Sequence, residues 1–454
     1  MADNLQLFKE LTKQFTLDPL EADDPRYVQL RPTGESAVDA LRTDIVLAER
    51  ARVLLVAGAR GAGKSTEFNR LKVDLEASGA YRVAIVDALA YLNGSQPLDI
   101  HKLLLILVAR TVEVFVDEIN DDTHPTTKTR LLGLLRRLKI GLKVAGAEFN
   151  VSAAGVSAGF AGQSMTIDLS GGTQEVQSNL LDQVRNEAAD LHGFVEDVRG
   201  FFQDLRRDLG QELVIIVDSL DKFRGTRETD VEIQRSIATL FVQYREQLGF
   251  PSHHMIYTIP AHINATDPSV AAAYDGAIRF VPVVKLFGQG DRDETEPIPN
   301  SVRLMTEVAQ ARRTKHNEDV HNLLGTDSDH LKRVIIASGG QLRDLFRVLR
   351  EIVAIAHRLK VALPVPTAVV DQAIAAIQRD FADLYAEDIE LIAKVRDSNG
   401  APDVTEEELP RLGRLLEAHV LLAHQNGVIW FAVHPLAQQA INERKRQQGL
   451  TNGG

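Results

Sequence analysis

The sequence predicts an α/β fold in which a parallel sheet with an inserted segment is followed by an all-α helical domain and a C-terminal winged helix. Apolar runs typical of buried strands alternate with amphipathic helices as far as residue 284. Only amphipathic helices follow between residues 302 and 385. The last part reads as two helices and two short strands joined by Asn426-Gly427, a dipeptide favoured in type I′ hairpins.

The sheet is expected from short apolar runs rich in Val, Ile and Leu, the composition of strands that are buried on both faces. These strands are expected at 53–56, 82–87, 213–218, 255–258 and 277–284. Helices are expected at 1–15, 35–49, 66–77, 175–209 and 231–248. Strand and helix therefore alternate along the chain, as they do in proteins built from parallel strands with crossover helices.

The chain between the second and third expected strands is longer than such a domain needs. It contains a helical stretch at 98–137 and a tract at 144–163 that is more than half Ala, Gly and Ser, where a small hairpin or a loop is expected. We interpret residues 95–210 as an insertion that contacts a partner or a second copy of the chain.

Composition limits the classes of function. The chain has 454 residues, 44% of them hydrophobic and 25% charged, as in folded globular proteins. It has no Cys, which excludes disulfides and thiolate chemistry and favours a cytoplasmic location. The net charge of −12 argues against a general nucleic-acid coat protein. The longest apolar run, 103–109, is too short to cross a membrane, and the first residues do not read as a secretory signal.

One motif carries most of the functional information. Residues 58–65 read Gly-Ala-Arg-Gly-Ala-Gly-Lys-Ser and match the phosphate-binding loop G-x-x-x-x-G-K-[ST], between an expected strand and an expected helix. Gly58, Gly61 and Gly63 allow successive backbone N–H groups to surround phosphate oxygens. The N-terminus of the following helix adds partial positive charge at the same place. The motif predicts a P-loop NTPase that binds ATP or ADP.

The side chains that close this loop have separate expected roles. Lys64 is expected to reach the β- and γ-phosphates and to assist catalysis. The Ser65 hydroxyl is expected to hold Mg²⁺, and Thr66 is expected to lie near the α-phosphate. ATP or ADP with Mg²⁺ is therefore the predicted ligand.

Polar residues at the ends of two other expected strands are catalytic candidates. Asp218 follows a buried apolar run, and we expect it to hold Mg²⁺ through water. Asp221 either orients the attacking water or caps the following turn. Thr258 either contacts the γ-phosphate or the attacking water, or serves only as a strand-forming residue.

The phosphate loop, Leu213–Phe223 (LVIIVDSLDKF), Tyr257–Pro260 (YTIP) and Ser338–Phe346 (SGGQLRDLF) together resemble the AAA+-related STAND ATPases, which include the NACHT and NB-ARC signalling proteins. The resemblance implies that an ATPase domain, a helical domain and a winged helix close over ADP. It also implies that exchange of ADP for ATP opens the protein for oligomerisation.

The resemblance assigns two further nucleotide contacts. Arg343 resembles the sensor-2 arginine of AAA+ lids, whereas Leu342 stands where the helical-domain GxP motif of the STAND proteins has proline. His434 resembles the histidine of the winged-helix MHD motif, which touches the β-phosphate of ADP, and Pro435 replaces the aspartate of that motif. Arg343 and His434 are therefore expected to set the difference in affinity between the closed and open states.

Strand pattern and resemblance together predict the domain organisation. Its parts are an N-terminal helical segment (1–50), a P-loop ATPase domain (51–290), a helical lid domain (300–380), a winged-helix domain (385–446) and a tail (447–454). No internal repeat or effector domain is evident. We therefore expect a homo-oligomer that acts on a separate protein effector, with no membrane partner.

The leading hypothesis is a slowly hydrolysing STAND-like ATPase whose nucleotide state controls oligomerisation, in bacterial signalling or anti-phage defence. The alternative is a DNA-associated AAA+ ATPase that resembles origin-recognition or transposition-regulating proteins. The Glu-rich segment Thr405–Glu417 argues against DNA, because a recognition helix presents Lys and Arg, whereas the basic stretch Lys128–Lys143 favours it. A third interpretation is a nucleotide-binding scaffold without turnover, in which Asp221 and Thr258 are structural.

Overall fold

The computed structural model describes residues 2–31, 35–120, 125–144, 147–149, 165–168, 184–225, 229–266, 268–274, 278–289, 296–326, 329–381, 384–398, 400, 404–405, 407–426 and 428–447. The chain divides into two compact units. The sheet unit comprises Val38–Ala57 and Leu71–Arg279, and the helical unit comprises Met1–Ala37, Gly58–Arg70 and Phe280–Gly454. We describe each unit by itself.

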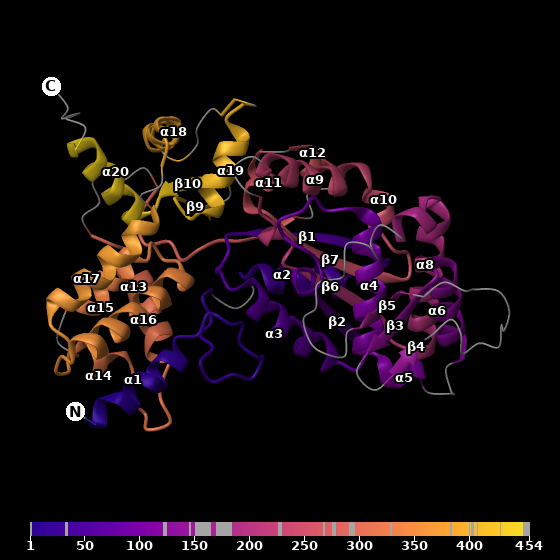
Figure 1. Cartoon of the computed structure of the whole chain (residues 1–454), viewed down its shortest axis with the longest axis horizontal. Helices are drawn as coiled ribbons and strands as arrows, with labels where there is room; N and C mark the ends of the chain where they lie inside the picture. Colours follow the sequence, from indigo (N-terminus) through magenta and orange to yellow (C-terminus); the bar gives the residue numbers. More distant parts are fainter. Residues whose placement is uncertain are drawn as a thin grey trace. The chain divides into compact units, whose positions relative to one another are not determined.

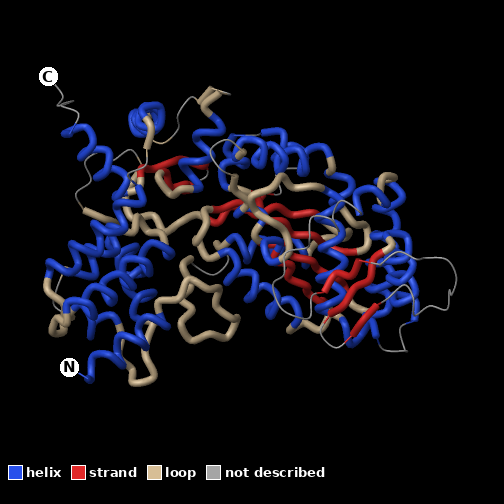
Figure 2. Tube along the Cα trace, in the orientation of Figure 1, coloured by secondary structure: helices blue, strands red, loops and turns tan. Residues whose placement is uncertain are grey.

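The main sheet has five strands in the order β2-β6-β7-β1-β8. Figure 2 draws the strands of the protein in red. Its strands are β1 (Val53–Gly58), β2 (Tyr81–Asp87), β6 (Glu212–Asp218), β7 (His253–Ile259) and β8 (Ile278–Val281). The pairs β1–β7, β2–β6 and β6–β7 are parallel. The predicted fold class is confirmed, and every strand expected from an apolar run is present.

The strands form where the apolar runs lie because helices cover the sheet. Leu213–Val217 of β6 are fully buried, which requires a continuous apolar run instead of the alternation of a half-exposed strand. Helix α4 (Ile100–Val114) packs on β2, and α8 (Leu191–Leu209) packs on β7. The other helices described in this part of the chain are α2 (Ala37–Val46), α3 (Lys64–Glu76), α9 (Asp230–Gln243), α10 (Arg245–Leu248), α11 (Ala261–Thr266) and α12 (Pro268–Ala273).

The inserted segment lies between β2 and β6, which are neighbours in the sheet, and differs in detail from the prediction (Figure 1). The expected helix at 98–137 is three helices: α4, α5 (Val116–Asn120) and α6 (Pro125–Leu138). A second sheet follows, in the order β4-β3-β5, built from β3 (Ile140–Val144), β4 (Ala147–Phe149) and β5 (Met165–Asp168). Strands β3 and β4 pair as a small hairpin that begins before the tract at 144–163 where a hairpin or a loop was expected, and β5 was not predicted. Residues 150–164 lie outside the described residues.

The long helix expected at 175–209 is wrong in its extent. The chain is not helical at 188–190, and α8 begins at Leu191 because the side chain of Asp190 accepts a hydrogen bond from Gly193 N. Asp190 thereby satisfies one of the free N–H groups of the helix start. Residues 175–183 lie outside the described residues.

Helix α16 (Leu342–Leu359) is the centre of the helical unit. Leu345, Phe346, Leu349 and Val353 lie on its buried face, whereas Leu342 is half-buried. The N-terminal helix α1 (Ala2–Gln14) packs on α16, and Phe15 stacks on Phe346 with ring centroids 6.2 Å apart. The surrounding elements are α13 (Pro299–Gln310), α14 (Val320–Leu324), α15 (His330–Ala337), α17 (Thr367–Gln378) and the 3-10 helix η4 (Arg379–Phe381).

The C-terminal part of the helical unit contains two helices and the expected hairpin. These elements are α18 (Ala386–Asp397), α19 (Leu409–Glu417), β9 (Leu421–Asn426) and β10 (Val428–Val433). The strands are antiparallel, with Asn426 paired to Val428, and Gly427 lies outside the described residues. A further helix, α20 (Pro435–Gln447), was not predicted; it starts at a proline, which is favoured in the first turn of a helix. Within the described residues, no helix is both long and apolar enough to cross a membrane.

Candidate functional site

The phosphate loop joins β1 to α3, as the motif predicts. Gly61 and Gly63 have φ values of 80° and 95°, in the left-handed region that favours glycine. Lys64 is the first residue of α3 and is buried. Its Nζ donates hydrogen bonds to the carbonyl oxygens of Gly58 at 2.8 Å and Ala59 at 2.9 Å. The lysine ammonium is therefore held within its own loop.

The helix that follows the loop also holds the N-terminal segment. Thr66 Oγ1 accepts a hydrogen bond from Leu20 N at 3.0 Å, and Asn69 Nδ2 donates to Leu20 O at 2.9 Å. Tyr27 OH donates to Glu67 at 2.8 Å. The structure thus gives Thr66 a contact with the chain before the sheet, which the motif did not predict.

The start of α16 lies against the phosphate loop. Gln341 Nε2 donates a hydrogen bond to Arg60 O at 3.1 Å. A Cβ atom built on Gly61 would lie 2.6 Å from Cβ of Arg343, so the Arg343 side chain packs directly over this glycine. The structure brings Arg343 to the loop, as expected for a lid arginine, and its contact with a phosphate stays a prediction. Sequence reasoning missed Gln341, which lies two residues before it.

Close packing of Gly340 fixes the path of this segment and gives a stability prediction. Gly340 has a φ of 81°, and a Cβ built on it would lie 1.9 Å from the backbone oxygen of Val284. We expect Gly340→Ala to destabilise the protein by about 3 kcal/mol or more, measured as the midpoint of urea unfolding. Gly79→Ala is the matched control, because its φ is 69° and nothing lies within 4 Å of the added atom. The control should cost only about 1 to 2 kcal/mol, and equal costs for the two variants would contradict the argument.

The remaining catalytic candidates lie in the sheet unit. In the parallel register, Thr258 of β7 pairs with Val56 of β1, and Val217 of β6 pairs with Tyr257. Asp218 therefore ends its strand at the sheet edge where β1 runs into Gly58. This is the edge at which ligands bind in parallel sheets.

Backbone contacts orient these side chains. Asp218 is buried, and its Oδ1 accepts a hydrogen bond from Ser219 N at 2.6 Å. Thr258 Oγ1 donates to Val217 O at 3.3 Å and accepts from Leu220 N at 3.0 Å. Thr258 thus ties the end of β6 to the 3-10 helix η3 (Leu220–Lys222), which contains the buried Asp221. The catalytic roles of all three residues stay predictions.

His434 lies immediately after β10 and is fully buried. Its Nε2 donates to Ser338 O at 3.1 Å, and its Nδ1 accepts from Leu436 N at 3.2 Å. Burial lowers the pKa of His434 to about 4, although Asp344 acts in the opposite direction. The imidazole is therefore neutral at pH 7, and its observed partners are protein groups. Contact with a β-phosphate stays a prediction.

A buried carboxylate that the sequence did not single out stands beside His434. Asp344 Oδ2 lies 3.2 Å from His419 Nδ1 and 3.6 Å from His434 Nε2, and its Oδ1 accepts from Arg347 at 3.0 Å. Burial by itself would raise the pKa of Asp344, but the hydrogen bond from His419 and the positive charge of Arg347 lower it to about 2. No local pattern marks Asp344 or His419, because their contact joins residues 75 positions apart.

Comparisons with known proteins add little to this geometry. No protein-family model matches the chain, and no curated protein matches it. Similar solved structures include Aeropyrum pernix ORC1 in complex with DNA (14% identity, TM-score 0.38, covering 96% of this chain and 98% of that one). The ADP form of Aeropyrum pernix ORC2 has 12% identity and a TM-score of 0.45, covering 97% and 98%. CDC6P from Pyrobaculum aerophilum has 14% identity and a TM-score of 0.38, covering 96% and 98%.

With TM-scores of 0.45 or less, these three matches carry no argument about function. They do not include a STAND protein, so a STAND-type signalling role is not shown. The architecture of the chain itself shows a parallel α/β fold with a phosphate-loop motif between β1 and α3, together with an α-helical part and a C-terminal helix–helix–hairpin part.

Proposed function

We propose that the chain is an ATP-binding P-loop ATPase of the AAA+ type. The observation that carries the proposal is the phosphate loop, whose two left-handed glycines and buried Lys64 stand between a parallel strand and a helix N-terminus. This arrangement suits phosphate oxygens, because it directs backbone N–H groups, a helix dipole and an ammonium group to one place.

The side chains expected around Mg²⁺ are of the right chemical kind. Ser65 supplies a hydroxyl and Asp218 a carboxylate, and oxygen donors of this type, together with water and phosphate oxygens, are what Mg²⁺ prefers. The bound ion would neutralise charge that develops on the phosphate oxygens. Arg343, over Gly61, is the lid residue best placed to supply a further positive charge.

The enzyme assignment is tested by Asp218→Asn. We expect this variant to bind Mg·ATP but to release phosphate about a hundredfold more slowly, because the amide cannot hold the ion as a carboxylate does. Asp87→Asn is the matched control, since Asp87 ends β2 directly opposite Asp218 in the sheet register but is exposed. A variant of Asp218 that hydrolyses ATP at the wild-type rate would overturn the assignment.

Nucleotide-controlled assembly is the finer form of this proposal that the STAND resemblance implies. Light scattering of the full chain in ATP, in ADP and without nucleotide measures the mass of the particle in each state. A monomer with ADP that becomes larger with ATP supports the proposed ATP-driven assembly and directs the search to a separate effector. A mass that never follows the nucleotide would contradict it.

Association with DNA is the second candidate. One similar solved structure is a complex of ORC1 with DNA. In this chain, the part before α20 has the helix–helix–hairpin arrangement expected of a winged helix. The C-terminal arrangement is the observation of this chain that supports the candidate.

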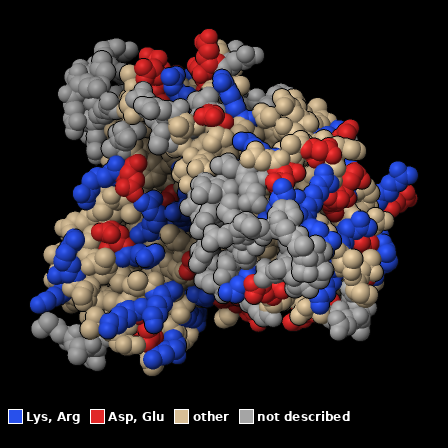
Figure 3. All heavy atoms as spheres, turned by 45° about the vertical axis from the view of Figure 1, so that its right-hand side comes forward, with Lys and Arg blue, Asp and Glu red and all other residues tan. Residues whose placement is uncertain are grey.

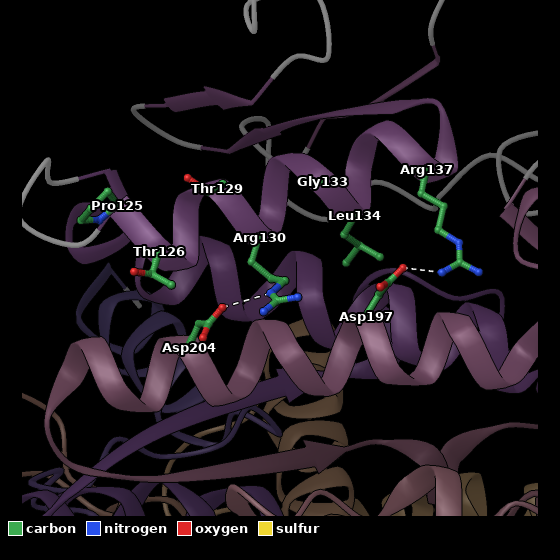
Figure 4. A pocket seen from close by; sticks show the side chains of 9 residues that line it. All are labelled: Pro125, Thr126, Thr129, Arg130, Gly133, Leu134, Arg137, Asp197 and Asp204. Atoms are coloured by element: carbon green, nitrogen blue, oxygen red, sulfur yellow. Dashed lines mark hydrogen bonds and ion pairs between the residues drawn. The ribbon is translucent and has the colours of Figure 1, made fainter.

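The charges of the structure do not favour a broad DNA-binding surface. In α19, the helix before the hairpin, Arg414 forms an ion pair with the buried Asp388, and Arg411 Nε lies 3.6 Å from the same carboxylate. In the basic stretch of the insertion, Arg130 and Arg137 point across the groove between α6 and α8 to Asp204 and Asp197 (Figure 4).

On the face drawn in Figure 3, Asp and Glu lie among many of the Lys and Arg, and Lys and Arg predominate at the lower left. Because the arginines of α6 and α19 named above are paired with carboxylates, we expect DNA binding through these helices to involve few phosphate contacts. Affinity should then fall only shallowly with salt, since each phosphate contact adds about 0.9 to the slope of log K against log salt. A steep slope, measured by fluorescence anisotropy of labelled duplex DNA, would restore a general DNA-binding function.

A further inference from the structure

We infer that Gln341 is a positioning residue that couples the phosphate loop to the β9–β10 hairpin through the segment Ser338–Asp344. The inference rests on the proposed function, because it takes nucleotide at the loop as the event that is transmitted. It concerns residues of the helical unit alone.

The contact of Gln341 with the loop is unusually well defined. The side chain is fully buried, and its Nε2 donates to Arg60 O at 3.1 Å. Its Oε1 is also buried and has no hydrogen-bond partner among the described residues. In this structure Ala62 N donates a hydrogen bond to Ala59 O at 3.2 Å, so this loop N–H has to turn before it can bind a phosphate oxygen. A glutamine side chain can keep a hydrogen bond to the loop before and after such a turn. Its NH₂ group donates to a backbone carbonyl in one state, and its amide oxygen accepts from a backbone N–H in the other.

Hydrogen bonds made by residues on either side of Gln341 connect this segment to both ends of the hairpin. Three residues before Gln341, Ser338 O accepts a hydrogen bond from His434, which lies immediately after β10. Three residues after it, Asp344 accepts from His419, which lies two residues before β9. The segment that contacts the loop is thus fastened to the chain at both ends of the hairpin.

A second set of contacts connects this segment to the hairpin through residues between β8 and α13. Gly340 O accepts a hydrogen bond from Val284 N at 3.2 Å. The neighbouring residue, Lys285, places its Nζ 5.4 Å from the ring centroid of Trp430 in β10. Trp430 in turn stacks on His424, its cross-strand partner in β9, with centroids 4.5 Å apart.

The segment Ser338–Asp344 and the hairpin are closely packed against each other. A Cβ atom built on Gly339 would lie 2.8 Å from Leu422 of β9 and 3.0 Å from His434. Closely packed interfaces of this kind pass on a small shift as a change between discrete arrangements. A displacement of Gln341 by the loop therefore has to move the hairpin.

Trp430 supplies a direct readout, because it is the only Trp of the chain. The experiment uses the full-length protein with Mg·ADP and Mg·ATP. Calorimetry establishes binding and the concentration that saturates each protein, and Trp430 emission is then compared with and without saturating nucleotide. We expect a change of emission in the wild type and a loss of at least about half of its amplitude in Gln341→Leu.

Matched variants separate coupling from folding. Gln439→Leu makes the same change at an exposed position of α20 and should keep the wild-type amplitude. His419→Gln, which lies away from the loop contacts, should also reduce the amplitude. If Gln341→Leu does not fold, as judged by circular dichroism, Gln341→Met decides, because it keeps nearly the size of the side chain but has no donor for Arg60 O.

The outcomes distinguish the two proposals. Absence of binding heat in the wild type would overturn the proposed function and, with it, this inference. Binding without a change of Trp430 emission would overturn the coupling alone. A wild-type amplitude in the decisive Gln341 variant would show that another residue transmits the signal.

Discussion

Lys64→Ala is expected to weaken nucleotide binding by about a hundredfold or more. In the structure, the Lys64 ammonium is held by two carbonyl oxygens of the loop, and in the proposed complex it meets the β- and γ-phosphates. Loss of a buried cation opposite a phosphate costs about 3 kcal/mol or more, which is about a hundredfold in affinity. The measurement is calorimetry with Mg·ATP and Mg·ADP.

Lys72→Ala provides the control for this experiment. Lys72 lies on the same helix, where its Nζ donates to Val83 O at 2.9 Å and lies 3.8 Å from Glu76. Lys72→Ala tests whether the loss of any lysine of α3 weakens nucleotide binding by disturbing the fold. We expect the control to bind nucleotide with nearly the wild-type affinity. Wild-type affinity in Lys64→Ala would instead show that the motif does not bind phosphate in this protein.

The main sheet could be predicted because local sequence and tertiary environment agree there. The run Leu213–Val217 is apolar at every position, and a strand covered on both faces needs that composition. The second sheet could not be predicted, because β3 begins directly after α6 and its partner β5 lies more than twenty residues along the chain. The break before α8 also has no strong signal, since only the Asp190 cap marks it.

The part of the site that could be predicted is the phosphate loop, because its sequence motif corresponds to one backbone conformation. The glycines and lysine of the phosphate loop need a particular spacing, and Gly61 and Gly63 have the positive φ values that favour glycine. Gln341, Asp344 and His419 escaped prediction because each acts through a contact distant in the sequence. His434 was identified as a residue of interest, but its observed partners are Ser338 and Asp344.

Acidification from pH 7 to pH 5 is expected to destabilise the protein strongly, because several histidines are buried without charge. Burial lowers the pKa of His253 and His424 to about 3, and that of His262 and His434 to about 4. All four values lie below the ordinary value of about 6.5 in an unfolded chain. Below that pH the unfolded state therefore binds more protons than the folded state, and stability falls as pH falls.

The loss begins near pH 6.5 and continues toward the folded-state values near 4 and 3. Each histidine contributes a slope of up to about 1.4 kcal/mol per pH unit, so four together are sufficient to unfold a protein of ordinary stability. The measurement is the urea midpoint between pH 7.5 and pH 5. His253→Phe should reduce the slope, because His253 packs between Phe202 and Phe250 and the variant carries no titrating group.

His192→Gln is the control for the acid experiment, since His192 is an exposed residue of α8 and its replacement should leave the slope unchanged. The contribution of Asp344 is lost in a different pH range from that of the histidines. Because its pKa is lowered to about 2, its protonation reduces the stability only below about pH 4. A urea midpoint that stays constant from pH 7.5 to pH 5 would mean that these imidazoles are protonated inside the fold. The neutral hydrogen-bonding pattern of His434, on which the hairpin contact depends, would then be wrong as well.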